Sequence, residues 1–397
     1  LHDALPISER LEFLTVSGDP NPAPQNLVVT GASTTPYDFT LSKTASWLTL
    51  SATAGVSPDT IVVSADIQPL EPGEYFDTIL IDAPLAEEPI PVPVRLVVAS
   101  WVQTWITGAE QTSTPYSLRG IHFVSAQTGF TAGLLSGGEI DGQISRTIDG
   151  GVSWPSGDRL IVDALLGDIM FTDNLHGCAV GQTILYTVDR GDSWTPAASA
   201  PGPYALNRVA FANSLFGWAV GNSGKILATS DGGVNWIAQT SGVLDDLKGV
   251  HFVDVARGWA VGNNGTVLST ADTGKTWVKT SLASGHDLWH VVFVNSTTGW
   301  IFGETGTIRK TTNGGVSWTA QVPPITARLS SAAFVSPTRG WAVGTGGTIL
   351  YTEDGLNWSI QPSGVNEDLA DVFFIDDNEG WICSDKGILL HTTGGGL

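Results

Sequence analysis

Residues 217–236 read GWAVGNSGKILATSDGGVNW and combine two glycine-rich turns, an Asp-Gly-Gly and two tryptophans. The stretch has the composition of a functional site, yet each of its parts recurs along the chain. Every copy of the Gly-Trp-Ala-Val-Gly run, or of its variants, is preceded by a phenylalanine six residues before its first glycine. A leucine lies five residues before each of these phenylalanines. Seven copies in one register indicate an internal repeat. The copies begin at Gly129, Gly177, Gly217, Gly258, Gly299, Gly340 and Gly380.

Each repeat of about 41 residues is expected to form four short strands separated by Gly, Asn and Asp turns. One such unit has the size of a propeller blade, and blades packed in a ring bury both of their faces. The sequence therefore predicts an all-β, seven-bladed β-propeller of four-stranded blades over residues 100–397, with blades from about residue 117. The seventh repeat stops before its fourth strand, and residues 101–108 (WVQTWITG) resemble the missing strand. We expect this segment to pair with the seventh repeat and close the ring.

The turn before the fourth strand matches the pattern S/T-x-D-x-G-x-x-W, which resembles the Asp box of neuraminidase-like propellers. An Asp side chain can accept hydrogen bonds from backbone N–H groups two residues on, glycine supplies a positive φ, and the tryptophan covers the turn. The same acid repeated around a ring is unsuited to catalysis, which needs acids at one place. We therefore predict a structural role for Asp149, Asp189, Asp231, Asp272, Asn313 and Asp354.

A binding site is expected where the repeats differ. The two positions after the constant leucine vary freely, and on a propeller they would surround the mouth of the central channel. The candidate binding residues are Arg119, Asp168, Arg208, Lys248, Trp289, His290 and Asp371. Tyr116, Tyr204 and Arg328 lie in the loops just above, and a longer loop at 134–143 in the first repeat is expected to overhang the same face. The alternative is that these are ordinary solvated polar residues.

The remaining titratable residues carry no recognisable motif. His122 and His251 occupy one column of the repeat and are expected to be packed side chains, because they are too far apart in the repeat to share a metal. Cys178 and Cys383 lie in apolar runs and are expected to be buried free thiols. We therefore predict no catalytic residue, no metal and no cofactor.

The first hundred residues lack the repeat and contain six strand-like runs separated by Pro, Gly and Asp turns. The segments ASWLTLSATAGVSPDTIVVSAD and LEPGEYFDTILI resemble a BACON domain, an immunoglobulin-like β-sandwich, over residues 9–99. The resemblance implies that Trp47 is a core residue and Tyr75 a corner residue. Residues 1–8 (LHDALPIS) fit nothing that follows and resemble a translated sequencing adapter, so we expect a non-native leader that has replaced the start of the protein.

The propeller repeats resemble the photosystem II stability/assembly-factor family. That family consists of seven-bladed, non-catalytic, extracytoplasmic propellers that hold a membrane-protein subunit during assembly. The resemblance implies a protein partner and an extracytoplasmic location. The net charge of −21 disfavours nucleic acid and anionic lipid as partners. No apolar run of 18 residues predicts a membrane span, and we expect a monomer.

Two other functions are open. An Asp-box glycoside hydrolase, of the sialidase or xyloglucanase kind, would use Arg119, Arg208 and Arg328 with a tyrosine (Tyr116 or Tyr204) and Asp168. Its Arg-Ile-Pro motif is absent, and sialidases have six blades. A non-catalytic carbohydrate-binding protein would instead stack sugar rings on Trp289 and the tyrosines. A binding scaffold for a protein partner fits the sequence best.

Overall fold

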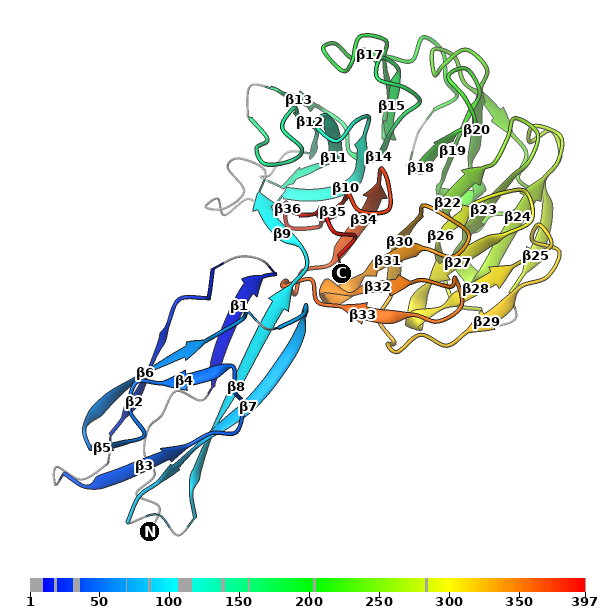
Figure 1. Cartoon of the computed structure of the whole chain (residues 1–397). Helices are drawn as coiled ribbons and strands as arrows, with labels where there is room; N and C mark the ends of the chain where they lie inside the picture. The colour runs from blue at the N-terminus through cyan, green and yellow to red at the C-terminus, as the bar shows by residue number, and fades with distance from the viewer. Residues whose placement is uncertain are drawn as a thin grey trace. The chain divides into compact units, whose positions relative to one another are not determined.

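The computed structural model describes residues 10–17, 20–30, 36–68, 70–84, 86, 88–105, 116–136, 140–155, 158–202, 205–282 and 285–396. The predicted leader (residues 1–8) and Tyr204 lie outside these ranges. The chain divides into two compact units, with the boundary between Trp101 and Val102 (Figure 1).

The first unit consists of two β-sheets around one hydrophobic core, to which both contribute buried side chains. Burial alternates along its strands, as in β1, where Leu11 and Phe13 are buried and the residues between them are exposed. The six predicted strands are present, and β1 and β5 are additional. The five-stranded sheet contains β1 (Leu11–Val16), β8 (Ile90–Ala99), β7 (Gly73–Asp82), β3 (Asp38–Ser42) and β5 (Ala54–Val56), in that order; the three-stranded sheet contains β2 (Gln25–Val29), β6 (Asp59–Ala65) and β4 (Leu48–Leu50).

Trp47 and Tyr75 take the places expected for a core and a corner residue. Trp47 is buried and meets the Tyr75 ring edge-on, with 6.4 Å between the ring centroids. The Tyr75 hydroxyl donates a hydrogen bond of 2.7 Å to the carbonyl oxygen of Glu71, four residues upstream, which is the arrangement of a tyrosine corner. The unit is thus a β-sandwich, and its assignment to the BACON family stays a prediction.

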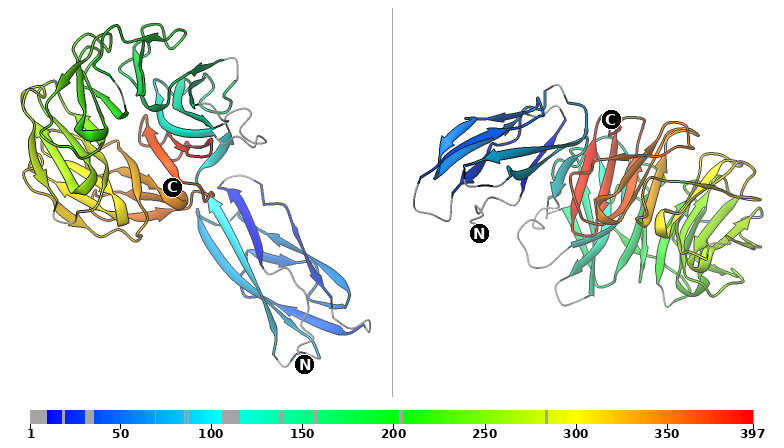
Figure 2. Two further views of the ribbon diagram at one scale, coloured as in Figure 1. Left: turned by 180° about the vertical axis from the view of Figure 1, so that it is seen from behind. Right: turned by 90° about the horizontal axis from the view of Figure 1, so that it is seen from below.

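The second unit contains seven four-stranded antiparallel sheets, one for each repeat, arranged in a ring (Figures 1 and 2). We call them blades 1 to 7. Their strands are β10 (Tyr116–Phe123), β11 (Gly129–Ser136), β12 (Ile140–Thr147) and β13 (Arg159–Val162) in blade 1; β14 (Leu166–Phe171), β15 (Gly177–Gly181), β16 (Ile184–Thr187) and β17 (Thr195–Pro196) in blade 2; β18 (Leu206–Phe211), β19 (Gly217–Gly221), β20 (Ile226–Thr229) and β21 (Ile237–Gln239) in blade 3; β22 (Leu247–Phe252), β23 (Gly258–Gly262), β24 (Thr266–Thr270) and β25 (Val278–Ser281) in blade 4; β26 (Leu288–Phe293), β27 (Gly299–Gly303), β28 (Ile308–Thr311) and β29 (Thr319–Gln321) in blade 5; β30 (Leu329–Phe334), β31 (Gly340–Gly344), β32 (Ile349–Thr352) and β33 (Ser359–Gln361) in blade 6; and β34 (Leu369–Phe374), β35 (Gly380–Ser384) and β36 (Ile388–Thr392) in blade 7.

The fourth strand of blade 7 is supplied by the segment before blade 1. Strand β9 (Val102–Trp105) pairs antiparallel with β36, which places Val102 opposite His391 and Trp105 opposite Ile388. The innermost strands β10 and β34 also lie against each other. The start and the end of the repeat region are therefore joined in one sheet, and the ring is closed.

In most blades the turn between the second and third strands is a short 3₁₀ turn. Four such turns are η2 (Asn222–Gly224), η3 (Asn263–Gly265), η4 (Glu304–Gly306) and η5 (Thr345–Gly347). Blade 1 differs, because the predicted loop at 134–143 is largely a longer hairpin in which Leu134 pairs with Gly142. The tip of this hairpin, residues 137–139, lies outside the described residues.

Neighbouring blades are joined by the Gly-Trp-Ala-Val-Gly strand. Its tryptophan stacks on the repeat phenylalanine of the next blade, with ring centroids 3.5–3.9 Å apart, in the pairs Trp218–Phe252, Trp259–Phe293, Trp300–Phe334, Trp341–Phe374 and Trp381–Phe123. The same five indoles donate hydrogen bonds of 2.8–3.4 Å to carbonyl oxygens in the Asp-box turn region of that next blade or, for Trp341, in the corresponding turn of blade 7. Blades 1 and 2 lack this tryptophan and carry Phe130 and Cys178 instead.

The two glycines of this strand are required by close packing. A Cβ on Gly217 would lie 2.6 Å from the Phe211 ring, and a Cβ on Gly221 would lie 2.2 Å from the carbonyl oxygen of Ala205. The first glycine thus lies beneath the repeat phenylalanine, and the second lies beneath the chain that leads into the constant leucine.

The Asp-box side chains stabilise their own turns. Asp231 accepts hydrogen bonds from the Asn235 backbone N–H and from the Thr229 hydroxyl, both at 2.9 Å. The donor is four residues on rather than the two that the sequence suggests, because the turn is longer; only the shorter sixth copy uses the N–H group two residues on, that of Leu356. Gly232 and Gly233 have φ of 75° and 96°, as expected.

Hydrogen bonds hold these carboxylates in the ionised form. The Ser193 side chain and backbone lower the pKa of Asp189 to about 2. Asn313 accepts the same backbone bond, from Ser317 at 3.0 Å, without any charge. The turn therefore needs an acceptor and not an acid.

Replacing Asp231 tests this role. Asp231→Ala should lower the free energy of unfolding by about 1 kcal/mol, because the Thr229 hydroxyl and the backbone and side-chain N–H groups of Asn235 lose their acceptor. Asp231→Asn should cost less, as Asn313 shows that an amide can serve. Urea unfolding followed by tryptophan fluorescence measures both, since all but one of the 15 tryptophans follow residue 100. Equal stability of the Ala variant and the wild type would contradict the assignment.

Candidate functional site

The seven innermost strands share an irregularity directly after the constant leucine. In β10, Leu118 pairs with Gly133 and Gly120 pairs with Ala132, so Arg119 has no partner in the ladder. The same β-bulge occurs in β14, β18, β22, β26, β30 and β34. A bulge re-aims the extra side chain away from the regular alternation of the strand.

The bulge separates the two variable positions into two layers. The residues at the first position all line one open cavity of about 570 Å³ at the start of the innermost strands: Arg119, Gly167, Asn207, Lys248, Trp289, Ser330 and Ala370. Of the second position, only Arg208 reaches this cavity. The structure thus corrects the single ring expected from the sequence, because Asp168, His290 and Asp371 do not line the cavity surface.

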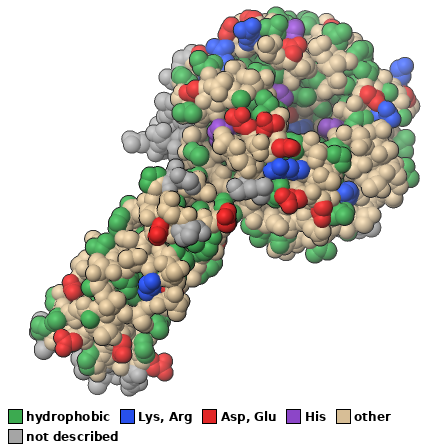
Figure 3. Space-filling view, in the orientation of Figure 1, with side chains coloured by type: hydrophobic (Ala, Val, Ile, Leu, Met, Phe, Trp, Pro, Cys, Tyr) green, Lys and Arg blue, Asp and Glu red, His purple; other side chains and the backbone are tan. Residues whose placement is uncertain are grey.

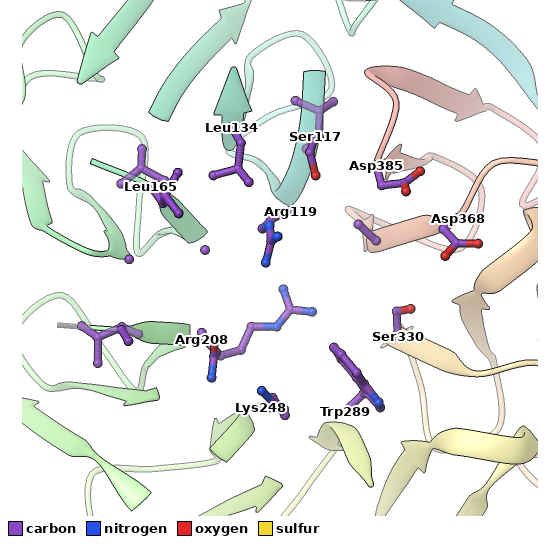
Figure 4. A pocket seen from close by; sticks show the side chains of 18 of the residues that line it. Ser117, Arg119, Leu134, Leu165, Arg208, Lys248, Trp289, Ser330, Asp368 and Asp385 are labelled. Atoms are coloured by element: carbon purple, nitrogen blue, oxygen red, sulfur yellow. The ribbon is translucent and has the colours of Figure 1, made fainter. Parts of the chain in front are cut away.

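We call this cavity the bowl. Figure 4 looks into it and shows Arg119, Arg208 and Lys248 near its centre, Leu134 and Leu165 on one side, and Asp368 and Asp385 on another. The left panel of Figure 2 shows the ring from behind, relative to Figure 1. Figure 3 views the ring from the other side, where the centre is also hollowed and histidine side chains are visible within it.

Trp289 is the aromatic residue of the bowl lining. Its indole N–H donates a 3.1 Å hydrogen bond to Glu304 Oε1, which fixes the ring. The Arg328 guanidinium lies 4.6 Å and the Lys248 ammonium 5.8 Å from the ring centroid, within the range of cation–π attraction. The result is a rigid apolar surface flanked by two cations.

Arg328 occupies a position that has a different role in other blades. The residue before the constant leucine is Asp246, Asp287 or Asp368 in blades 4, 5 and 7, and each accepts a backbone N–H from the 3₁₀ turn of the preceding blade at 2.8–2.9 Å. An arginine cannot accept such a bond. Arg328 instead pairs with Asp368 at 3.5 Å and packs on Trp289. Comparing this column across the repeats is the sequence signal that identifies Arg328 as a bowl residue.

Arg208 bonds to residues of four other blades. Its guanidinium bonds to Asp168 Oδ1 at 3.2 Å, Asp371 Oδ1 at 2.9 Å and Ser331 Oγ at 3.1 Å, and it lies 3.5 Å from His290 Nδ1. These partners belong to blades 2, 7, 6 and 5, so one side chain from blade 3 crosses the centre of the ring. Arg208 forms the floor of the bowl. Its charge is already balanced by Asp168 and Asp371, which lie beneath the bowl surface.

The two aspartates also bond to neighbouring blades directly. Asp168 Oδ2 accepts the Val209 N–H at 2.9 Å, and Asp371 Oδ2 accepts the Ile121 N–H at 3.1 Å across the ring closure. Burial raises the pKa of Asp168 to about 6; Arg208 opposes this shift, and Asp371 adds to it. Burial together with Arg208 holds the pKa of His290 well below its ordinary value. Asp168, His290 and Asp371 are therefore structural partners of Arg208.

The histidine column lies further along the same strands. His122 lies between Phe171 and Phe373, with ring centroids 6.2 and 4.6 Å away, and His251 lies 6.5 Å from Phe293. Burial lowers the pKa of both histidines to about 4. They are packed neutral side chains, as the sequence suggests. Cys178 and Cys383 are buried free thiols, also as expected.

A sialidase-like site would place three arginines around the carboxylate of its substrate. Of the three arginines that a sialidase-like site would need, Arg208 is fully engaged with Asp168 and Asp371. The side chain of Tyr116 and all of Tyr204 lie outside the described residues. Within the described ranges, no three His, Cys, Asp or Glu residues are grouped so as to hold a metal ion. In the same part of the chain, no helix is long and apolar enough to cross a membrane.

Removing the Arg208 charge should strongly destabilise the propeller. Arg208→Met leaves two buried carboxylates unpaired, and we expect a loss of about 3–5 kcal/mol in the free energy of unfolding. The triple variant Arg208→Met, Asp168→Asn, Asp371→Asn should recover part of this loss, since asparagine still accepts the two backbone bonds. Chemical unfolding compares the three proteins. Unchanged stability of Arg208→Met would show that the cluster contributes nothing.

Acid should destabilise the propeller through its buried histidines. His122 and His251 have a pKa of about 4 in the folded state and about 6.5 when unfolded, so the unfolded state binds more protons between these values. Stability should therefore fall as the pH drops from 6.5 to 4, by at most about 1.4 kcal/mol per pH unit for each histidine. Asp168 opposes this trend, because burial raises its pKa and the folded state therefore binds one proton more than the unfolded state at this residue. Blade 2 has Met170 at the position of His251, so His251→Met is a fitting replacement. It should make the free energy of unfolding depend less on pH between 6.5 and 4. An unchanged pH dependence would contradict the assignment to the buried histidines.

Comparisons with known proteins identify a matching family and solved structures with a similar fold. The family described as Photosynthesis system II assembly factor YCF48 matches residues 151–241, 238–323 and 317–397. A solved structure of YCF48 bound to a D1 peptide is similar with a TM-score of 0.60 and 20% identity, over 74% of this chain and 95% of that chain. YCF48 from Cyanidioschyzon merolae is similar with a TM-score of 0.59 and 19% identity, over 74% and 98% of the two chains. No curated protein matches. Because the family match spans more than half of the sequence, the chain belongs to the YCF48 assembly-factor family.

Proposed function

We propose that this protein is a non-catalytic scaffold that binds a peptide segment of a partner protein in the bowl. The observation that carries the proposal is the first variable layer, in which seven β-bulges place residues of differing chemistry, six of them with side chains, around one cavity. Binding surfaces combine a rigid aromatic anchor with a few placed polar groups. Trp289, held by Glu304, supplies the anchor, and Arg119, Lys248 and Arg328 supply the polar groups.

The related solved structure supports the same mode of action. That YCF48 is bound to a D1 peptide, and it shares the propeller fold with this chain. We propose that this chain likewise holds an extended segment of a partner protein. The residues that line its bowl determine which protein is bound. The family resemblance also leads us to propose an extracytoplasmic location. Detecting the protein in the periplasmic or secreted fraction of its native host would test that location.

A random twelve-residue peptide library, displayed on phage and selected against the full chain, tests binding in the bowl. Selected peptides should lose at least tenfold in affinity with Trp289→Ala and with Arg119→Glu, measured by fluorescence anisotropy. Asp231→Asn, at the opposite end of a blade, is the matched control and should bind normally.

Three outcomes would overturn the proposal. The selection could yield no peptides, or the peptides could bind the Trp289→Ala protein as well as the wild type. Binding to a glycan array in place of peptides would favour the carbohydrate-binding alternative, and hydrolysis of a chromogenic glycoside would favour the enzyme. Circular dichroism of each variant separates loss of binding from loss of fold.

A further inference from the structure

We propose that one wall of the bowl, formed by Ser330, Asp368 and Asp385, is a subsite for a basic side chain of the bound peptide. We call it the acidic wall. The inference rests on the proposed function and adds the chemistry of the partner, namely a lysine or arginine placed to reach blades 6 and 7. All three residues line the bowl, and Figure 4 shows them on the same side of it.

Asp385 carries a carboxylate oxygen that lacks a donor. Its Oδ1 atom is shielded from solvent, and no described residue donates a hydrogen bond to it. Buried polar atoms are nearly always paired, so an unpaired carboxylate oxygen on a residue that lines the bowl indicates a missing donor. Burial raises the pKa of Asp385, although Lys386 and Arg328 act against this, and the nearby acids Asp368 and Glu367 raise it further. A ligand cation would relieve this unfavourable environment.

Ser330 provides a second, independent indication. The residue is only 9% exposed, and its hydroxyl is also without a partner among the described residues. It is the bulge residue of β30, so the bulge directs it toward the bowl. A lysine ammonium has three donors and no acceptor, which matches the acceptors of Asp385, Ser330 and Asp368.

The chain's own cations leave this wall acidic. Arg328 is engaged with Asp368 at 3.5 Å and with the Trp289 ring, and Lys386 is an exposed residue of the turn after β35. Two cations therefore face the three acids Asp368, Asp385 and Glu367.

The rest of the bowl has the opposite character. Arg119 is exposed, and it forms no ion pair with any residue in the described ranges. Leu134 and Leu165 supply an apolar surface beside it. A bound segment is therefore oriented, with its basic side chain at the acidic wall and its apolar or acidic side chains toward blades 1 and 2. Charge complementarity of this kind determines register and partner choice more than affinity.

The test uses peptides selected from the same library on the full chain. Selected sequences should be enriched in lysine or arginine at one position relative to the unselected library. Replacing that residue by glutamine should weaken binding about tenfold, which is the typical effect of losing one charged hydrogen bond. The Asp385→Asn protein should bind the original and the glutamine peptide with nearly equal affinity. Asp377→Asn, an exposed residue between β34 and β35 at the opposite end of the blade, is the matched control and should retain the tenfold preference.

The outcomes separate this inference from the function on which it rests. Peptides that depend on Trp289 but show no basic enrichment, or an Asp385→Asn protein that keeps the full preference, would overturn the acidic wall and leave the peptide-binding function standing. Failure to obtain any peptide would overturn both. Free lysine, spermine and a selected lysine-containing peptide with blocked termini are compared as ligands. Binding of the peptide without binding of free lysine or spermine shows that the acidic wall takes a lysine side chain within a polypeptide. Binding of spermine without binding of the peptide would contradict the proposal.

Discussion

Each of five blades is held to the next by one tryptophan, and the ring depends on this interaction. The indole stacks on the next blade's phenylalanine and donates its N–H to a carbonyl oxygen of the neighbouring turn region. Stacking contributes about 0.5–1.5 kcal/mol and the hydrogen bond about 1 kcal/mol. The last of these contacts joins Trp381 to Phe123 and to the carbonyl oxygen of Gly150, so the same contact that orders the blades also closes the ring.

The Asp-box turn has a clear purpose in this arrangement. Its carboxylate or amide holds the turn in one conformation, and the turn then presents a carbonyl oxygen to the preceding blade. Asn313 serves as well as an aspartate because only an acceptor is required. The last turn of blade 7 has no such side chain, yet Gly395 still offers its carbonyl oxygen to Trp341. The most motif-like part of the sequence is therefore the framework of the ring.

The centre of the ring is organised by a charge rather than by apolar packing. Arg208 crosses the axis and satisfies acceptors on four other blades, while Asp168 and Asp371 also bond to backbone N–H groups of blades 3 and 1. A buried cation of this kind is tolerated only when its acceptors are in place. It closes the bottom of the bowl and leaves the layer above it free to vary. Trp289 and Ser330 lie in that variable layer, and Arg328, Asp368 and Asp385 line the bowl beside it.

The repeat pattern was sufficient to predict the seven blades, the strand that closes the ring and the structural role of the Asp boxes, because spacing alone determines how equal units stack. It also identified the variable positions, including Arg119, Lys248 and Trp289. It could not show that adjacent variable residues point to different layers, since the bulge appears only in the pairing of β10 with β11 and its equivalents. The partnership of Arg208 with Asp168 and Asp371 joins residues up to 163 positions apart. The sequence by itself determined the ring; only the tertiary structure decided which side chains are bound within it and which remain available to a ligand, because that depends on contacts made across the axis between blades distant in the chain.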